Sequence, residues 1–358
     1  MKKIFFTPGP AELYPTVIKH FQKGLEDQIP SISHRGQQFH EIFKDAVIGV
    51  KQLLSVPDDY HVFFVSSATE AMERTIQNCV EKNSFHFVNG SFSKRFFVIS
   101  KELGKNPASI TVDSGQGFDF KNSNIPDSTE LICMTHNETS TGVMLLVNEI
   151  HKIAKQHKNA LIAVDIVSSV PYVNLDYKLL DVVFFSVQKG MGLPAGLGVM
   201  IVSPRALEKS EKLLEKGKSI GSFRGFPTLL AFANEDQTLE TPPVLQMYLL
   251  GKIAKDMQKI GIEKIREATE EKAAMLYEFL EQSNIYSAVV TDKKFQSKTV
   301  IVADVQKVKE DLRKKLAKKG LIVGSGYGVN KNTQIRIANF PTHSIADVKR
   351  LIRELKVL

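Results

Sequence analysis

The sequence has no tryptophan and only two cysteines, Cys79 and Cys133, among its 358 residues. The two cysteines do not form a Cys-X-X-Cys pair, so the sequence predicts neither a disulfide framework nor a zinc site. No apolar run reaches the roughly 18 residues that a membrane-spanning helix needs. Prolines and Glu12 interrupt the first apolar stretch, which is too short for a secretory signal. We therefore expect a cytoplasmic protein with no membrane partner and no bound metal.

The overall composition is that of a globular protein, with 43% hydrophobic and 24% charged residues. The net charge of +8 allows an anionic partner but does not by itself indicate nucleic acid. A basic helix is expected from Val305 to Lys319. We interpret its charge as a solvated helix face, because no aromatic or glycine-rich strand alternates with it, and we expect no nucleic-acid partner.

Seven short apolar segments recur between His61 and Val202, and most lack a strict alternation of polar and apolar residues. They are HVFFV, FHFV, SITV, ELICMT, LIAVDIV, DVVFFSV and GVMIV. Such runs are typical of strands covered on both faces, as in a mainly parallel sheet. Stretches with helical spacing lie between them, for example from Asn148 to His157. The sequence therefore predicts an α/β domain with a mainly parallel, seven-stranded sheet.

The pattern changes after Pro242 and Pro243, which interrupt the chain. Two long helical stretches, the strand KTVIVAD, the basic helix, a strand around Ile335 and a final amphipathic helix follow. This order predicts a smaller α+β domain, on which the extended N-terminal segment packs. We place the large domain at 17–257 and the small domain at 1–16 and 258–358.

Two charged residues directly follow apolar strands, where open α/β sheets bind ligands. Asp165 ends the strand in LIAVDIV, and burying it without a partner would be costly, so it needs a cation or several donors. Lys189 lies in SVQKGMGLPAG, where burial would lower its pKa and make its amine a nucleophile. A turn-capping aspartate and a surface lysine in a glycine-rich loop are the alternatives.

The string SSATEAME follows the strand HVFFV and opens a helix. Free backbone N–H groups there, with the hydroxyls of Ser66, Ser67 and Thr69, could hold a phosphate. An ordinary helix N-cap is the alternative. Pyridoxal phosphate would explain all three features, because it needs a lysine, a carboxylate facing its pyridine nitrogen and a phosphate site at a helix terminus.

The chain also resembles a known family along its whole length. The matching strings are TPGPAELYP, ISHRGQQFHEIF, SSATEAME, HNETSTG, VDIVSS, QKGMGLPAG, ETPPVLQMYLL and IRIANFP. They resemble the class V aminotransferases, pyridoxal-phosphate enzymes of fold type I. Within this class the strings are most similar to the phosphoserine aminotransferases, with the serine/alanine–glyoxylate aminotransferases as the alternative. A cysteine desulfurase is disfavoured because Gln188 stands where those enzymes usually have a histidine.

The resemblance implies a role for each matching residue. Lys189 would form the Schiff base with the coenzyme and then move the substrate's proton, and Asp165 would pair with the pyridine nitrogen. Thr139 would bind the phenolic oxygen, and Phe92 would stack on the ring in place of a tryptophan found in many relatives. The coenzyme phosphate would lie near Ser67, Ala68, Thr69 and Gln188.

The resemblance further implies a homodimer with shared active sites. Thr241 would reach the phosphate of the neighbouring subunit's coenzyme, and Arg336 would bind the α-carboxylate of the substrate. His34 and Arg35 would come from the other subunit and meet the distal phosphate or carboxylate. The expected substrates are glutamate and 3-phosphohydroxypyruvate.

Several features depart from the family pattern or admit simpler explanations. Glu240 replaces a usual asparagine, and we expect its carboxylate to point away from the phosphate. The His-Arg pair that many phosphoserine enzymes carry before the carboxylate-binding arginine is missing, and Lys331 is the nearby cation. Arg336 could instead form a strand-edge salt bridge, His34 could cap a helix, and Phe92 could belong to the core. A non-catalytic, polyanion-binding protein on the same fold is a further alternative.

Overall fold

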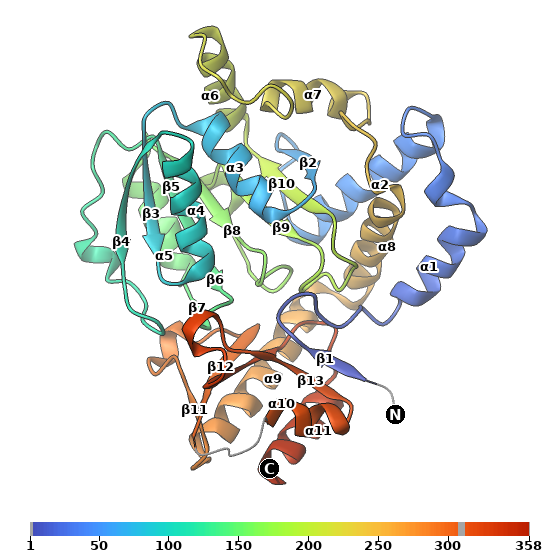
Figure 1. Cartoon of the computed structure of the whole chain (residues 1–358). Coiled ribbons are helices and arrows are strands. Elements are labelled where there is room, and N and C mark those ends of the chain that lie inside the picture. Colours follow the sequence, from blue (N-terminus) through green and yellow to red (C-terminus); the bar gives the residue numbers. More distant parts are fainter. Residues whose placement is uncertain (1–2, 307–311, 358) are drawn as a thin grey trace.

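The computed structural model describes residues 3–306 and 312–357, which form a seven-stranded sheet, a five-stranded sheet and a two-stranded hairpin, with helices around them (Figure 1). The larger sheet has seven strands in the order β2-β10-β9-β8-β5-β3-β4. Their bounds are β2 His61–Val65, β3 Asn83–Val88, β4 Asn106–Thr111, β5 Leu131–Thr135, β8 Leu161–Asp165, β9 Val182–Ser186 and β10 Gly198–Val202. Each contains or overlaps one of the apolar segments expected to form strands.

The larger sheet is parallel except at β10, which runs antiparallel to both β2 and β9. Strands β5, β8, β9 and β10 are buried along their whole length. Covering on both faces explains why their sequences are continuous apolar runs. The expected α/β fold with a mainly parallel, seven-stranded sheet is therefore confirmed.

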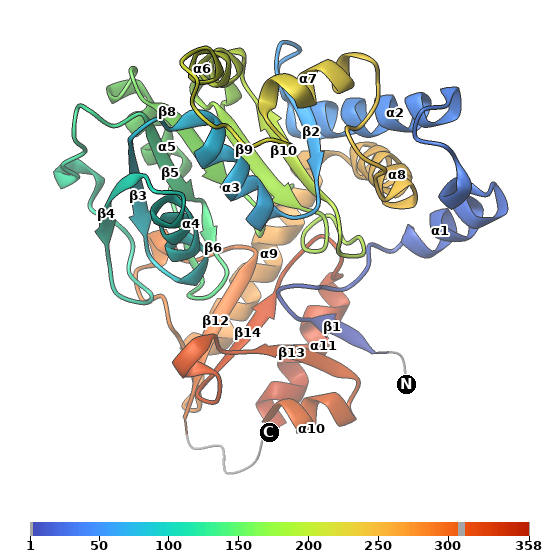
Figure 2. The same ribbon diagram turned by 45° about the horizontal axis from the view of Figure 1, so that its top comes forward.

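Helices surround the larger sheet and cover its faces (Figures 1 and 2). They are α1 Val17–Glu26, α2 Gln37–Leu54, α3 Ala68–Cys79, α4 Ser91–Glu102, α5 Val147–Gln156, α6 Pro204–Glu215, α7 Phe226–Asn234 and α8 Val244–Ile260. Helices α3 and α4 pack on each other, and α4 also contacts β3, β4 and β5. The short hairpin of β6 Asn137–Glu138 and β7 Val143–Met144 follows β5.

The second sheet has five strands in the order β1-β13-β14-β12-β11 and lies below the first in Figures 1 and 2. Its bounds are β1 Ile4–Phe6, β11 Tyr286–Ala288, β12 Val300–Val305, β13 Leu321–Ser325 and β14 Gln334–Ala338. Helices α9 Ile262–Glu281, α10 Leu312–Lys318 and α11 Ile345–Val357 accompany it. β1 pairs in parallel with β13, as expected for the N-terminal segment.

The second sheet has its own hydrophobic cluster, formed with residues of α9, α10 and α11. The division into a large domain at 17–257 and a small domain at 1–16 and 258–358 stays a prediction. Of the basic helix expected from Val305 to Lys319, Lys307 to Asp311 lie outside the described residues. The 3₁₀ helices are η1 Ile29–Ser31, η2 Phe120–Asn122, η3 Tyr177–Leu179, η4 Lys293–Phe295 and η5 Gly328–Asn330.

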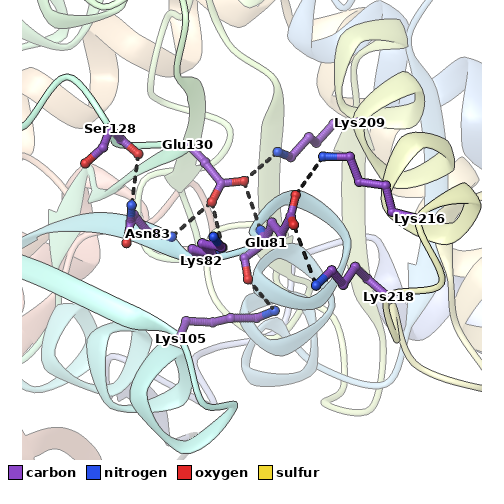
Figure 3. A network of polar contacts seen from close by, with 9 residues as sticks. All are labelled: Glu81, Lys82, Asn83, Lys105, Ser128, Glu130, Lys209, Lys216 and Lys218. Atoms are coloured by element: carbon purple, nitrogen blue, oxygen red, sulfur yellow. Dashed lines mark hydrogen bonds and ion pairs between the residues drawn. The ribbon is translucent and has the colours of Figure 1, made fainter.

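A carboxylate ties together the amino ends of two strands at one edge of the larger sheet (Figure 3). Glu130, just before β5, accepts hydrogen bonds from the backbone N–H groups of Glu81, Lys82 and Asn83 at 3.0, 2.6 and 3.0 Å. Its carboxylate also pairs with Lys209 at 2.5 Å. This network fixes the start of β3 beside the start of β5. The carboxyl ends of the same strands lie at the opposite edge, where Asp165 and Lys189 are found.

Neither cysteine is paired, since Cys79 and Cys133 are both free and buried. Burial raises the pKa of both thiols. Within residues 3–306 and 312–357, no helix combines the length and apolarity needed to cross a bilayer. In the same part of the chain, no group of three or more histidine, cysteine or acidic side chains is arranged to hold a metal ion.

Candidate active site

A cavity opens at the carboxyl ends of β8 and β9, between the larger sheet and the start of α3. This is the edge at which parallel α/β sheets bind ligands. All of the coenzyme-binding residues that the family resemblance implied, except Thr241, line it. The lining consists of Ser67, Ala68, Thr69, Met72, Phe92, Asn137, Thr139, Asp165, Val167, Ser186, Gln188 and Lys189.

Lys189 is buried at the centre of this cavity rather than exposed in a surface loop. Its Nζ donates to the hydroxyl of Thr139 at 2.9 Å and lies 4.8 Å from the centre of the Phe92 ring. Burial lowers the pKa of Lys189 to about 8, although the nearby Asp165 opposes this shift. About one tenth of the amine is therefore unprotonated at pH 7, far more than for an ordinary lysine, and this neutral form is the nucleophile.

The backbone approaches Lys189 closely at Gly9. This residue has a φ of +143°, and an added Cβ would lie 3.0 Å from Cε of Lys189. Glycine therefore allows the N-terminal segment to pass along the lysine stem, and this contact contributes to holding the amine over the cavity.

Asp165, the last residue of β8, is almost completely buried. One of its oxygens accepts the backbone N–H of Val167 at 2.8 Å. Burial raises its pKa to about 7, while this hydrogen bond and the positive charge of Lys189 act in the opposite direction. A carboxylate with a raised pKa in a cavity is suited to receive a cationic group of a ligand, which would offset its desolvation.

The N-terminus of α3 differs in one respect from the expected phosphate site. The N-cap Ser67 accepts the N–H of Glu70 at 3.2 Å, and the N–H of Ala68 donates to the Ser186 hydroxyl at 2.7 Å. The backbone N–H and hydroxyl of Ser66 both donate to the Glu70 carboxylate, at 2.9 and 2.6 Å. Ser66 does not line the cavity, so the expectation that its hydroxyl faces a phosphate is wrong. The carboxylate of Glu70, four residues later, accepts hydrogen bonds from both the N–H and the hydroxyl of Ser66.

The cavity contains polar groups that are ready to bind a ligand. Oδ1 of Asn137 and Oε1 of Gln188 are buried and find no hydrogen-bond partner among residues 3–306 and 312–357. Buried polar atoms without partners are costly, and a bound molecule would satisfy them. Together with the amine, the carboxylate and the start of α3 that lines the cavity, they match the polar groups of pyridoxal phosphate. The residues present therefore fit this coenzyme.

Arg336, on β14, lies beside the cavity. It donates from Nη1 to the backbone oxygen of Thr139 at 3.3 Å and from Nε to that of Ser325 at 2.7 Å. Its guanidinium lies 5.3 Å from the ring centre of Tyr327, which in turn lies 5.6 Å from that of Phe92. Its hydrogen-bond partners in the described part of the chain are backbone carbonyls, so the strand-edge salt bridge is not what holds it. Phe92 is only half-buried and faces Lys189, unlike a core residue.

His34, Arg35 and Thr241 form a separate group outside the cavity. Nδ1 of His34 lies 3.4 Å from the Thr241 hydroxyl. Arg35 donates to the side chain of Gln237 at 2.6 Å and to the backbone oxygens of residues 238 and 239 at 2.7 and 3.0 Å. Helix α2 begins at residue 37 with Gly36 as its N-cap, so His34 does not cap it.

Glu240, next to Thr241, pairs with Arg224, and the same guanidinium pairs with Glu70. Both carboxylates are therefore compensated within the chain. Through these two ion pairs, Arg224 links the loop before α8 to the start of α3, a link that was not expected from the sequence.

Several cavity residues were not singled out from the sequence. Asn137, Val167 and Ser186 lie at or just after the carboxyl ends of strands, which is the signal that could have indicated them. Met72 lies one turn into α3 and faces the cavity from the helix. Glu138 is completely buried beside the cavity, and no sequence signal pointed to it.

Comparison with known proteins places this geometry in a family. The profile of class-V aminotransferases matches residues 4–353. The chain belongs to the class-V aminotransferase family. It is therefore a transaminase that depends on pyridoxal phosphate, with the fold type I architecture expected from the sequence.

The class-V relatives include proteins named as phosphoserine aminotransferases. One from Rhodococcus opacus is 26% identical over 357 residues, covering 98% of this chain and 93% of its own. The crystal structure of another, from Cytophaga hutchinsonii, is 49% identical with a TM-score of 0.97 and covers 99% of this chain and 98% of its own. An alanine–glyoxylate aminotransferase from Nostoc is 20% identical with a TM-score of 0.82, covering 100% and 95%, which shows the shared fold alone.

Proposed function

We propose that this class-V aminotransferase is a phosphoserine aminotransferase, which transfers an amino group between glutamate and 3-phosphohydroxypyruvate in serine biosynthesis. The observation that carries the proposal is that Lys189 and Asp165 line the same cavity, together with nearly all of the expected coenzyme residues. The similarity to the enzyme from Cytophaga hutchinsonii, at 49% identity over nearly the whole chain, supports this choice of substrate.

When bound, pyridoxal phosphate supplies an aldehyde that amines attack and a ring that accepts the electrons left when Cα loses its proton. In our proposal, Lys189 holds the coenzyme through its amine and afterwards moves the proton at Cα of the substrate. Asp165 keeps the pyridine nitrogen protonated, which makes the ring a better electron acceptor. Thr139 donates to the phenolic oxygen, and Phe92 covers one face of the ring. The phosphate is held near the start of α3 by Ser67, Ala68, Thr69 and Gln188.

Arg336 is proposed to bind the α-carboxylate of the substrate. It lies beside Thr139, and its planar guanidinium can form two parallel hydrogen bonds with a carboxylate. Burial lowers its pKa, although the group stays cationic near neutral pH. The distal phosphate or carboxylate is assigned to His34 and Arg35 of a second subunit.

A homodimer with shared sites would explain the group formed by His34, Arg35 and Thr241. It lies outside the cavity of its own chain, although these residues are expected to bind ligands. Helix α1 also leaves an apolar row exposed, since Ile18, Phe21 and Leu25 are 63%, 36% and 51% accessible. Exposed apolar rows of this kind typically cover a partner surface.

Mixing two inactive variants tests the shared site. Lys189→Ala and His34→Ala are each expected to lose most activity, and co-expression should restore roughly one quarter of it, because half of the dimers are mixed and each has one intact site. If every site is built from one chain, mixing will restore nothing.

The expected cytoplasmic location also belongs to the proposal, and two free, buried thiols agree with a reducing compartment.

The choice of substrate is tested by comparing kcat/KM for 3-phosphohydroxypyruvate and for glyoxylate with glutamate, serine and alanine as amino donors. We expect a clear preference for 3-phosphohydroxypyruvate with glutamate. A preference for glyoxylate with serine or alanine would instead favour the glyoxylate aminotransferases. That alternative has weaker support, because the Nostoc enzyme shares only 20% identity with this chain.

A further inference from the structure

Glu138 is a completely buried carboxylate that none of the proposed roles requires. It lies on β6, immediately before Thr139, whose hydroxyl accepts from Lys189. We propose that Glu138 is a positioning residue of the active site, which holds the N-terminal turn of α4, and with it the ring of Phe92, beside the amine of Lys189. This inference rests on the proposed roles of Phe92 and Lys189.

The two oxygens of Glu138 connect two separate parts of the chain. Oε2 accepts the backbone N–H of Phe92 at 3.1 Å, and the backbone N–H and hydroxyl of Ser93 at 2.9 and 3.0 Å. Oε1 accepts the N–H and hydroxyl of Ser140, in its own hairpin, at 3.1 and 2.6 Å. One carboxylate therefore fastens the first turn of α4 to the hairpin that carries Thr139.

The first turn of α4 is suited to a negative charge, because the unpaired N–H groups of a helix start attract anions. Gly90, the N-cap residue, lies so close that an added Cβ would be 2.4 Å from Cγ of Glu138. Any larger residue at this position would push the carboxylate and the helix apart. The close packing at Gly90 therefore helps to fix the helix start that carries Phe92.

The charge of Glu138 also acts on the reacting groups. It raises the pKa of Lys189, of Asp165 and of Arg336, which are the charged groups facing it across the cavity. On α4, the residues that contact it are uncharged. A neutral side chain at this position should therefore make the nitrogen supplied by Lys189 lose its proton at lower pH.

Glu130 provides a matched control, because it is also a carboxylate that accepts three backbone N–H groups at the start of a strand (Figure 3). It lies at the opposite edge of the sheet from the cavity. Glu130→Gln should therefore lower stability, as any loss of such a network does, without changing the coenzyme site. A purely structural role of Glu138 would give the same result for Glu138→Gln.

The positioning role is tested with a double-mutant cycle on the dissociation constant for pyridoxal phosphate. Glu138→Asp keeps the charge but is too short to reach both α4 and its own hairpin, and Phe92→Leu removes the ring. We expect each variant to bind the coenzyme several-fold more weakly, and the double variant to bind no more weakly than the weaker of the two. Effects that multiply in the double variant would overturn the inference.

The effect of charge is tested by titrating the visible absorbance of the coenzyme-loaded protein. In Glu138→Gln, the midpoint pH of the absorbance change should fall by about one unit. In Glu138→Asp and Glu130→Gln, the midpoint pH should stay near that of the wild type. An unchanged pH in a folded, coenzyme-loaded Glu138→Gln would overturn the inference. If this variant does not fold, the cycle with Glu138→Asp decides. A wild-type protein that binds no coenzyme would instead refute the proposed function.

Discussion

Replacing Asp165 with asparagine should stabilise the empty protein while weakening its binding of the coenzyme. The change keeps the size of the side chain and the oxygen that accepts the Val167 N–H, and it removes only the charge. Burial raises the pKa of Asp165 from 3.8 to about 7 in the empty cavity. Since each pKa unit corresponds to about 1.4 kcal/mol, holding this carboxylate ionised costs about 4 kcal/mol above neutral pH.

The pH dependence follows from the direction of this shift. Because the folded-state pKa is raised, the folded protein holds this proton more tightly than the unfolded chain, and the stability of the wild type falls as pH rises from about 4 to about 7. The amide that replaces the carboxylate cannot titrate, so the advantage of Asp165→Asn should grow over this range and then stay constant. The raised pKa already includes the attraction to Lys189, so the expected gain above neutral pH is about 4 kcal/mol.

Urea denaturation of coenzyme-free protein at several pH values measures this gain, with the exposed Asp113→Asn as the control. An absorbance titration with pyridoxal phosphate should show binding weaker by roughly a hundredfold, because the cationic ring nitrogen loses its buried partner at a cost of about 3 kcal/mol. A variant that gains no stability, gains the same amount at every pH, or binds the coenzyme normally would refute the reasoning.

Further substitutions test other parts of the structure. Arg336→Lys should raise KM for the amino donor at least about tenfold, because a lysine cannot form the two parallel hydrogen bonds of a guanidinium; an unchanged KM would contradict its role. Lys272→Met should lower the free energy of unfolding by about 2–4 kcal/mol, because its buried amine donates to two backbone carbonyls at 2.9 and 2.8 Å; thermal denaturation measures this. Gly190→Ala should prevent folding or coenzyme binding, because its Cβ would lie 1.8 Å from the backbone oxygen of Val170; a soluble, coenzyme-loaded variant would contradict this.

Much of the fold was predictable because its main sheet leaves a strong pattern. Strands covered on both faces must be apolar along their length, and each run found between His61 and Val202 became a strand. The strands that the sequence did not indicate are short or are interrupted by glycine. β13 contains Gly324 and lies partly at a surface, and β6 and β7 have only two residues each. Their pairing depends on distant segments, which local patterns do not record.

The site was predictable where chemistry follows the end of a strand. Lys189 and Asp165 could be identified because a charged residue there needs a ligand or a partner. Ser66 was misjudged because Glu70, four residues later, competes for its donors. Glu138 gave no signal in the sequence, because its proposed role depends on hydrogen bonds to a helix start 46 residues earlier in the chain.

The contact between His34 and Thr241 joins residues 207 positions apart, and no local pattern predicts it. The sequence suggested both residues only through resemblance to other proteins. Their position outside the cavity of their own chain is a result of the fold. It is this position that makes a second subunit part of the proposed site.

The most direct test of the account is to reduce the coenzyme-loaded protein with borohydride, digest it and locate the attached coenzyme by mass spectrometry. If Lys189 holds pyridoxal phosphate opposite Asp165, the added mass will be found on the peptide that contains Lys189 and on no other. Label on a different lysine, or protein that carries no coenzyme after reduction, would contradict the central claim.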